Sequence, residues 1–139
     1  MRLTTPEGER IGKDAVGELG ENLSVRHLRS VGYKVLDRNF RAVDGGEVDI
    51  VCRDNQTLAF VEVKTRTSSK WGRPADAVTM DKRYLINRGA MEWLRLLDWE
   101  DGRLNYRYDV IEVLLHDGEP PQFNLIKGAF ETPEPYIYG

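Results

Sequence analysis

The sequence predicts an α/β fold whose elements follow the order αβββαβ. Two stretches carry apolar residues at helical spacing, three β-type runs lie between them, and a fourth such run follows the second helix. The connection through the second helix is long enough to join two parallel strands. At 139 residues, the chain has the length of one domain with one hydrophobic core.

A helix and a short strand are expected first. Residues 12–31 carry leucine, valine and alanine at helical spacing, Ile11 extends the pattern by one residue, and Gly32 supplies a C-terminal stop. The next residues, 33–40 (YKVLDRNF), predict a strand. Gly17 and Gly20 weaken the helix, so they indicate a close approach by a strand or by a phosphate, and packing is the favoured interpretation.

Two further strands are expected to form a hairpin. They cover residues 47–53 and 58–65, and turn-forming residues separate them. Side chains alternate along a strand, so Val48, Ile50 and Cys52 are expected to share one face. Cys52 is the only cysteine, which excludes a disulfide within one chain and predicts a buried structural thiol.

The opposite face of this hairpin is expected to carry four charged residues. They are Glu47 and Asp49 on the first strand, and Glu62 and Lys64 on the second. Apolar residues precede the second pair on that face, which a purely solvent-exposed face would not carry, so we expect a charged pocket at the edge of a core. Opposed residues in an antiparallel pair have numbers with a constant sum. We predict a loop of two or four residues, which gives a sum of 111 and sets Asp49 opposite Glu62 and Glu47 opposite Lys64.

The second half of the chain is expected to contain a helix and one or two strands. The helix is predicted over residues 80–97 and a fourth strand over 106–115, with a further strand allowed over 123–130. Asp109 begins the apolar part of the fourth strand and is expected to pair with a basic neighbour. The Pro-rich residues 131–139 predict a loosely held tail.

Two carboxylates beside a lysine suit the metal-assisted hydrolysis of a phosphodiester. Mg²⁺ and Mn²⁺ prefer oxygen ligands, here the carboxylates of Asp49 and Glu62 and the backbone carbonyl of Val63. The Lys64 ammonium could orient the attacking water or stabilise developing negative charge. An ion pair of Lys64 with either carboxylate is the structural alternative. Chance predicts about one acid-x-Lys tripeptide in this composition, so the tripeptide is informative only in its strand context.

Two basic stretches favour contacts with nucleic-acid phosphates. Residues 64–73 (KTRTSSKWGR) carry no acid and residues 26–41 carry only one, although ordinary solvated surface explains either stretch equally well. Trp71 could stack on a base or anchor a loop. The expected nucleic-acid-binding residues are Arg41, Arg66, Lys70, Trp71, Arg73 and Lys82.

Composition narrows the class of protein further. The net charge of −3 and the sequence pI of about 5.5 argue mildly against a nonspecific nucleic-acid binder. The first residues lack the apolar segment of a signal peptide, and no apolar run approaches the ~18 residues of a membrane span. A cytoplasmic protein without a membrane partner is therefore expected.

A series of motifs adds a family resemblance to these inferences. The motifs are GELGE at 17–21, GYKVLDRNFR at 32–41, GGEVDIV at 45–51, FVEVKTR at 60–66, GRPADAV at 72–78, Lys82, YDV at 108–110 and IKGAF at 126–130. In this order, over residues 12–130, they resemble the YraN family of small bacterial endonuclease-like proteins. That family is itself similar to the PD-(D/E)xK nuclease superfamily and to archaeal Holliday junction resolvases.

The resemblance implies a restriction-endonuclease-like fold, which is a mixed β-sheet flanked by helices. We expect it to form a single domain over residues 1–130. The resemblance also implies that Asp49, Glu62 and Lys64 take the catalytic positions. The proline that precedes the aspartate in the superfamily's name is Val48 here.

Further carboxylates and the function follow from the same resemblance. Glu18 falls where related nucleases often place another acid, and Glu47 is a second candidate, whereas an exposed polar helix face accounts for Glu21. The implied function is metal-dependent hydrolysis of DNA, branched or single-stranded, with Mg²⁺ or Mn²⁺ as cofactor. The alternatives are a non-catalytic nucleic-acid-binding or scaffolding protein with a nuclease fold, and a protein-interaction module with a vestigial site. DNA is the expected partner, and a homodimer remains open.

Overall fold

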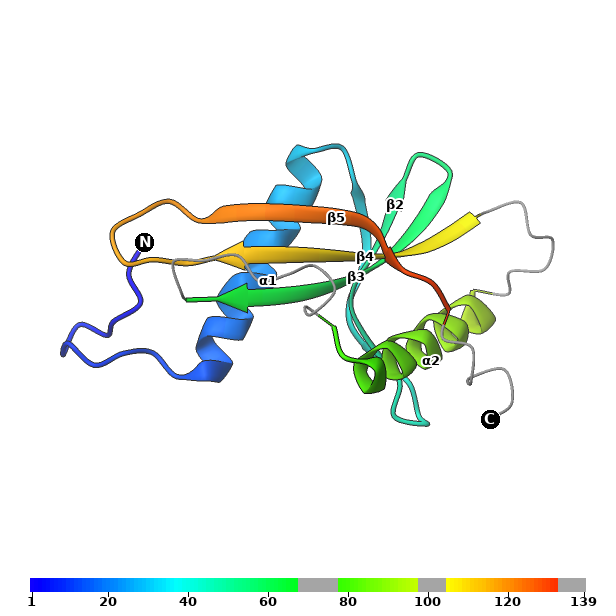
Figure 1. Ribbon diagram of the computed structural model, residues 1–139, viewed down its shortest axis with the longest axis horizontal. Coiled ribbons are helices and arrows are strands. Elements are labelled where there is room, and N and C mark those ends of the chain that lie inside the picture. The colour runs from blue at the N-terminus through cyan, green and yellow to red at the C-terminus, as the bar shows by residue number, and fades with distance from the viewer. Residues whose placement is uncertain (68–77, 98–104, 133–139) are drawn as a thin grey trace.

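The computed structural model describes residues 1–67, 78–97 and 105–132. Within these ranges the elements follow the predicted order, and a fifth strand ends the series (Figure 1). The prediction of an α/β fold is therefore confirmed. The elements are α1 (Lys13–Ser30), β1 (Lys34–Arg41), β2 (Glu47–Asp54), β3 (Thr57–Arg66), α2 (Met80–Leu96), β4 (Asn105–Leu114) and β5 (Gln122–Phe130).

The strands form one mixed sheet in the order β1-β2-β3-β4-β5. β3 and β4 run parallel, and every other neighbouring pair runs antiparallel. The connection between the parallel strands contains α2, as the length of this crossover predicted. The sheet is therefore mixed and packed by two helices.

Each face of the sheet has its own hydrophobic core. On the α1 face the buried residues are Leu3, Val25, Leu28, Tyr33, Ile50, Cys52, Ala59, Val61, Ile111, Val113 and Leu115. On the α2 face they are Val48, Val51, Leu58, Phe60, Val78, Ile86, Ala90, Leu94, Tyr108, Val110 and Phe130. The thiol of Cys52 is fully buried, which raises its pKa to about 12 and confirms the predicted structural role.

The β2–β3 hairpin has the register that the even-loop argument predicted. Asp54 pairs with Thr57 and Ile50 pairs with Val61, and both pairs sum to 111. The two-residue turn between the strands contains Asn55 in the left-handed region, at φ 55°, a conformation that asparagine tolerates better than most residues. The regular pairing of the two strands ends at Ile50 and Val61.

β2 departs from β3 beyond that point because its first residues pack against α2. A Cβ atom on Gly46 would lie 2.4 Å from the backbone nitrogen of Gly89, so the two backbones are in direct contact. As a result Val48 belongs to the α2-side core and Ile50 to the α1-side core. The prediction that Val48 shares a face with Ile50 and Cys52 is therefore wrong. Figure 1 shows the β1–β2 hairpin running past α2.

α1 approaches β3 closely at one of its glycines. A Cβ atom on Gly20 would lie 1.9 Å from Oγ1 of Thr65, so a side chain at this position would require Thr65 to move. Around Gly17, by contrast, a Cβ atom would meet nothing within 4 Å. The packing interpretation is therefore confirmed for Gly20, whereas Gly17 faces open space.

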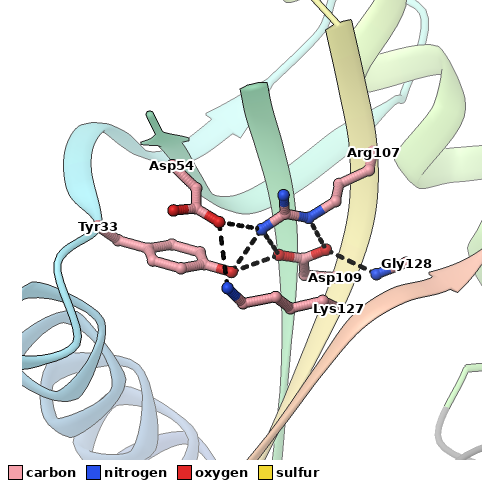
Figure 2. A network of polar contacts seen from close by, with 6 residues as sticks. All are labelled: Tyr33, Asp54, Arg107, Asp109, Lys127 and Gly128. Carbon is pink, nitrogen blue, oxygen red and sulfur yellow. Dashed lines mark hydrogen bonds and ion pairs between the residues drawn. The ribbon is translucent and has the colours of Figure 1, made fainter. Parts of the chain in front are cut away.

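A polar network joins several elements at the end of the sheet where the β2–β3 turn lies (Figure 2). The fully buried carboxylate of Asp109 accepts hydrogen bonds from Arg107 Nε at 2.8 Å and from the Tyr33 hydroxyl at 2.9 Å. Arg107 also donates to Asp54 at 2.8 Å. The predicted pairing of Asp109 with a basic neighbour is confirmed. The network comprises Tyr33, Asp54, Arg107, Asp109, Lys127 and the backbone N–H of Gly128.

Some predictions fall outside the ranges that the structure describes. They are the nucleic-acid contacts of Lys70, Trp71 and Arg73, and most of the Pro-rich tail at 131–139. In the described ranges, neither helix combines the length and the apolar character that a membrane crossing requires.

Candidate active site

β2 and β3 separate beyond the Ile50–Val61 pair, and we call this opening the fork. The fork brings the two predicted catalytic carboxylates together. Asp49 lies one residue beyond the last regular pair, and its Oδ2 accepts a hydrogen bond of 2.9 Å from the backbone N–H of Val63. The carboxyl groups of Asp49 and Glu62 are close enough for the charge of Asp49 to raise the pKa of Glu62. Burial raises the pKa of Asp49, and the Val63 N–H partly offsets this effect. The two carboxylates lie near each other, although the regular pairing ends before Asp49 would stand opposite Glu62. Their catalytic role remains a prediction.

Glu62 is the most perturbed acid of this site. It is only 9% exposed, and its Oε2 is buried without a hydrogen-bond partner. Burial, followed by the charge of Asp49, raises the pKa of Glu62 to about 9. A buried carboxylate oxygen without a donor is uncommon and calls for a missing partner such as a cation or a proton.

α1 contributes a third carboxylate, but not the one that the sequence favoured. Glu21 is half-buried, and it is close enough to the other acids for the charge of Asp49 to raise the pKa of Glu21 and for the charge of Glu21 to raise the pKa of Glu62. Burial is the main cause of the raised pKa of Glu21. Glu18 is exposed and lines a neighbouring cavity together with Glu21. Assigning Glu21 only to an exposed face was wrong, and the close contact at Gly20 was the available signal, since it draws α1 toward β3.

Lys64 lies at the open side of the fork. Its side chain is exposed and lines the same cavity as Asp49 and Glu21, and its charge partly counters the rise in the pKa of Glu62. Between these described residues, no ion pair joins Lys64 to Asp49 or to Glu62 within 4.0 Å. The structural alternative, a Lys64 salt bridge, is therefore not formed.

Glu47 binds two cations instead of facing Lys64. Its carboxylate pairs with Arg41 on β1 and with Lys82 in the first turn of α2. The predicted position opposite Lys64 is wrong because β2 leaves β3 before the register reaches Glu47. Arg41 and Lys82 were expected to bind phosphates, and here both neutralise an acid of the site.

Arg66 also has a carboxylate partner. Its Nε lies 2.9 Å from Oε2 of Glu112, which is fully buried. A buried ion pair of this kind is costly to break. The phosphate-binding role expected of Arg66 therefore remains a prediction that competes with a structural contact.

A cavity of about 680 Å³ opens between α1 and the fork. Its lining contains the acids Glu21 and Asp49 and several basic side chains. This combination suits a ligand that carries both phosphates and a cation. Asn39 lines it with a left-handed backbone, at φ 52°, and such residues cluster at functional sites. The charged and polar lining residues are Arg10, Lys13, Glu21, Asn39, Arg41, Asp49, Lys64, Thr65 and Thr67.

Comparison with known proteins places the chain in a family. The model of a family described as "Uncharacterised protein family UPF0102" matches residues 20–113. The chain belongs to the UPF0102 family. A UPF0102 protein of Trichlorobacter lovleyi is 47% identical over 124 residues, covering 86% of this chain and 93% of the relative. UPF0102 proteins of Geobacter metallireducens and Nocardia farcinica are 45% and 44% identical, over 84% and 87% of this chain and 93% and 94% of their own lengths.

Family membership confirms the coarser part of the resemblance drawn from the motifs, whereas the relationship to nucleases remains a prediction. The UPF0102 match includes the carboxylates of the fork and both lysines near it, Lys64 and Lys82. It also includes Glu21 and begins after Glu18. The acids of the fork, Glu21, Lys64 and Lys82 therefore all lie in the matched part of the chain, whereas Arg10 and Lys13 of the cavity precede it.

The donor set of this UPF0102 chain fits a divalent cation. Asp49 and Glu62 offer oxygen ligands, the carbonyl of Val63 is adjacent in sequence, and Glu62 Oε2 has no other partner. Across the described ranges, however, no group of three or more His, Cys, Asp or Glu side chains has the geometry to hold a metal. Two carboxylates with several retained waters are a common arrangement for Mg²⁺.

Proposed function

We propose that this UPF0102 protein is a nuclease that hydrolyses phosphodiester bonds in DNA, branched or single-stranded, with Mg²⁺ or Mn²⁺ as cofactor. The observation that carries the proposal is the state of Glu62, whose carboxylate is nine-tenths buried beside that of Asp49 and has one oxygen without a partner. Glu112 also has one buried oxygen without a partner, but its other oxygen pairs with Arg66 at 2.9 Å, whereas Glu62 lies beside the acids Asp49 and Glu21, whose charges raise its pKa.

Each residue of the fork has a task in this reaction. The carboxylates of Asp49 and Glu62, with the carbonyl of Val63, would hold the cation. When bound, a divalent cation neutralises charge on the phosphoryl oxygens and lowers the pKa of a bound water. The exposed ammonium of Lys64 would donate hydrogen bonds to a phosphoryl oxygen and stabilise the charge that develops there.

Residues around the cavity would position the substrate. Arg10 and Lys13, which line its outer part, would bind phosphates that flank the scissile bond. Neither residue has an ion-pair partner among the described residues. Their charges offset the acids at the centre of the site, which a negatively charged substrate would otherwise avoid.

Cleavage assays test the proposal directly. Duplex, single-stranded, flapped and four-way DNA should be incubated with Mg²⁺ or Mn²⁺, and at least one should be cut by the wild type and none in EDTA. Asp49→Asn, Glu62→Gln and Lys64→Ala should each abolish the cleavage, by about 10²-fold or more. Lys34→Ala, which removes an exposed lysine from the other end of β1, and Glu119→Gln are the controls and should leave cleavage intact. A Lys64→Ala protein that cuts at the wild-type rate would contradict the mechanism.

A second candidate is a nucleic-acid-binding protein that keeps the fold without catalysis. The absence of a metal-holding group of three side chains in the described residues favours it. This candidate predicts DNA binding that is the same with and without Mn²⁺, and no cleavage of any substrate in the assay above.

A further inference from the structure

Lys82 of α2 lies beside two acids from the sheet, Glu47 of β2 and Glu62 of β3. Its Nζ is 3.7 Å from Oε1 of Glu62 and also pairs with Oε1 of Glu47. The side chain is 31% exposed, so the ammonium is partly withdrawn from water. Lys64, the lysine of the predicted motif, makes no such ion pair with these two acids.

The backbone of α2 holds Lys82 in this position. Lys82 and Gly89 are seven residues apart, about two helical turns, so they lie on the same face of α2. Gly89 packs directly on β2, since a Cβ atom there would lie 2.8 Å from the backbone nitrogen of Glu47. Thr79 caps the helix by accepting a hydrogen bond from the Lys82 backbone N–H at 3.2 Å.

The two acids depend on Lys82 to different degrees. Glu47 has a second cation in Arg41 and would keep a partner without Lys82. Glu62 has Lys82 at one oxygen and no partner at the other. Among the ion pairs of the described residues, Lys82 is the only cation within 4.0 Å of Glu62.

We propose that Lys82 is a resident counter-ion of the site, which positions Glu62 while no divalent cation is bound and releases it when one binds. This inference rests on the proposed function, because it takes Asp49 and Glu62 to be cation ligands. A divalent cation binds the ionised form of Glu62. Two positive charges cannot share that buried carboxylate without a cost, so the ammonium and the metal compete. Lys82 is therefore a positioning residue. When a metal ion binds Glu62, the Lys82 ammonium remains paired with Glu47, which Arg41 also contacts.

Calorimetric titration with Mn²⁺ alone measures this competition. Lys82→Met should bind Mn²⁺ about fivefold more tightly than the wild type or better, the lower end of common coupling between two sites. Its Tm in EDTA should be lower than that of the wild type, and the rise of Tm on adding saturating Mn²⁺ should be larger. Lys82→Gln is a second uncharged variant that keeps hydrogen-bonding capacity, should Lys82→Met not fold. Lys82→Arg, which keeps the charge, should bind Mn²⁺ as the wild type does.

Two control variants distinguish the effect of losing the Lys82–Glu62 contact from the effect of losing any positive charge. Arg41→Gln removes a cation from Glu47 but none from Glu62, and should change the Mn²⁺ affinity less than Lys82→Met does. Lys127→Met removes a lysine paired with Asp54 at 3.2 Å, at the turn end of the sheet, and should leave the affinity unchanged.

The possible results lead to different conclusions. Wild-type protein that binds Mn²⁺, with uncharged Lys82 variants that bind it equally or more weakly, would overturn the counter-ion role and leave the proposed function standing. An equal increase of the Mn²⁺ affinity in Lys82→Met and Arg41→Gln would overturn the counter-ion role as well. Wild-type protein that takes up no Mn²⁺ would overturn the proposed function and this inference with it.

Discussion

At the scale of single residues, β3 changes character within five positions. Phe60 is fully buried in the α2-side core, Glu62 is almost buried, and Lys64 is exposed. The change coincides with the loss of β2 as a neighbour, since regular pairing ends at Val61. Where a strand loses a neighbour, its backbone and side chains must find other partners, and here the side chain of Asp49 supplies one of them to Val63.

The raised pKa of Glu62 predicts how stability depends on pH when no metal is present. Glu62 titrates at about 9 in the folded protein, against ~4.3 in an unfolded chain. The folded state therefore binds the proton more tightly, and the stability linked to Glu62 is full below pH ~4.3 and decreases as pH rises toward 9. The Glu62→Gln side chain cannot ionise, so this variant does not lose stability in this way as pH rises. In EDTA we expect the variant to exceed the wild type by about 1–3 kcal/mol at pH 8 and to gain less at pH 5.

Urea unfolding at both pH values measures the difference. Glu119→Gln, at an exposed position, is the matched control and should follow the wild type. A Glu62→Gln protein whose stability relative to the wild type is the same at pH 5 and pH 8 would show that Glu62 ionises normally.

At the scale of elements, the position of α2 depends on a backbone contact between two glycines. Gly46 and Gly89 leave no room for a Cβ atom on either side, and the atoms that would be met include backbone, which cannot rotate away. This contact draws the start of β2 toward α2 and opens the fork. The same contact places Lys82 close enough to pair with Glu47 of β2 and Glu62 of β3.

Two glycine substitutions in helices should therefore have opposite effects. Gly89→Ala should destabilise the protein by about 1–3 kcal/mol, because its Cβ would lie 2.8–3.0 Å from backbone atoms of Glu47. Gly17→Ala is the control, since its Cβ would meet nothing within 4 Å, and it should stabilise α1 by about 0.5–1 kcal/mol. Thermal unfolding of both variants tests the contact. Equal effects of the two substitutions would argue against it.

Local patterns predicted much of the fold and the centre of the site. Helical spacing predicted both helices, and the period of two in strands, with an even loop, predicted the register that brings Asp49 to Glu62. The bend of β2 could not be predicted, because it arises from the contact of Gly46 with a helix more than 40 positions away in sequence. Glu47 and Val48 were misplaced for that reason.

The role of Lys82 was missed for a related reason. Its motif context indicated a phosphate contact, and only the packing of α2 on β2 brings its ammonium to Glu47 and Glu62. Glu21 follows Gly20, which indicated close packing, but the sequence did not show that the packing partner is Thr65 of β3. Residues that reach the site across layers depend on tertiary contacts, whereas those of the hairpin depend on local alternation.

At the scale of the whole molecule, the sheet has a polar cluster near each end of β2. The fork holds Glu62, which has one buried oxygen without a hydrogen-bond donor, whereas the network around Asp109 gives its buried carboxylate several donors (Figure 2). The first arrangement suits a ligand, and the second suits stability. Asp109 links β4 to Tyr33, which follows α1, and to the backbone of β5.

Asp109→Ala should therefore be among the most destabilising substitutions in the chain. It leaves Arg107, the Tyr33 hydroxyl and the N–H of Gly128 without their shared acceptor, and we expect a loss of about 3–5 kcal/mol. Lys127→Met removes a member that is 55% exposed, and it should cost at most about 1 kcal/mol. Urea unfolding compares the two. A small effect of Asp109→Ala would mean that water replaces the carboxylate.

The parallel pairing of β3 with β4 also determines the order in which the protein can assemble. Every pair between these strands joins residues 48 positions apart, since 105 − 57 and 114 − 66 give the same value. The β2–β3 hairpin closes through a two-residue turn, so it can form within microseconds, while distant contacts form later. During synthesis Asp49 and Glu62 leave the ribosome before Lys82 does. The acids of the nascent chain are therefore exposed to the cations of the cell before Lys82 emerges to pair with them.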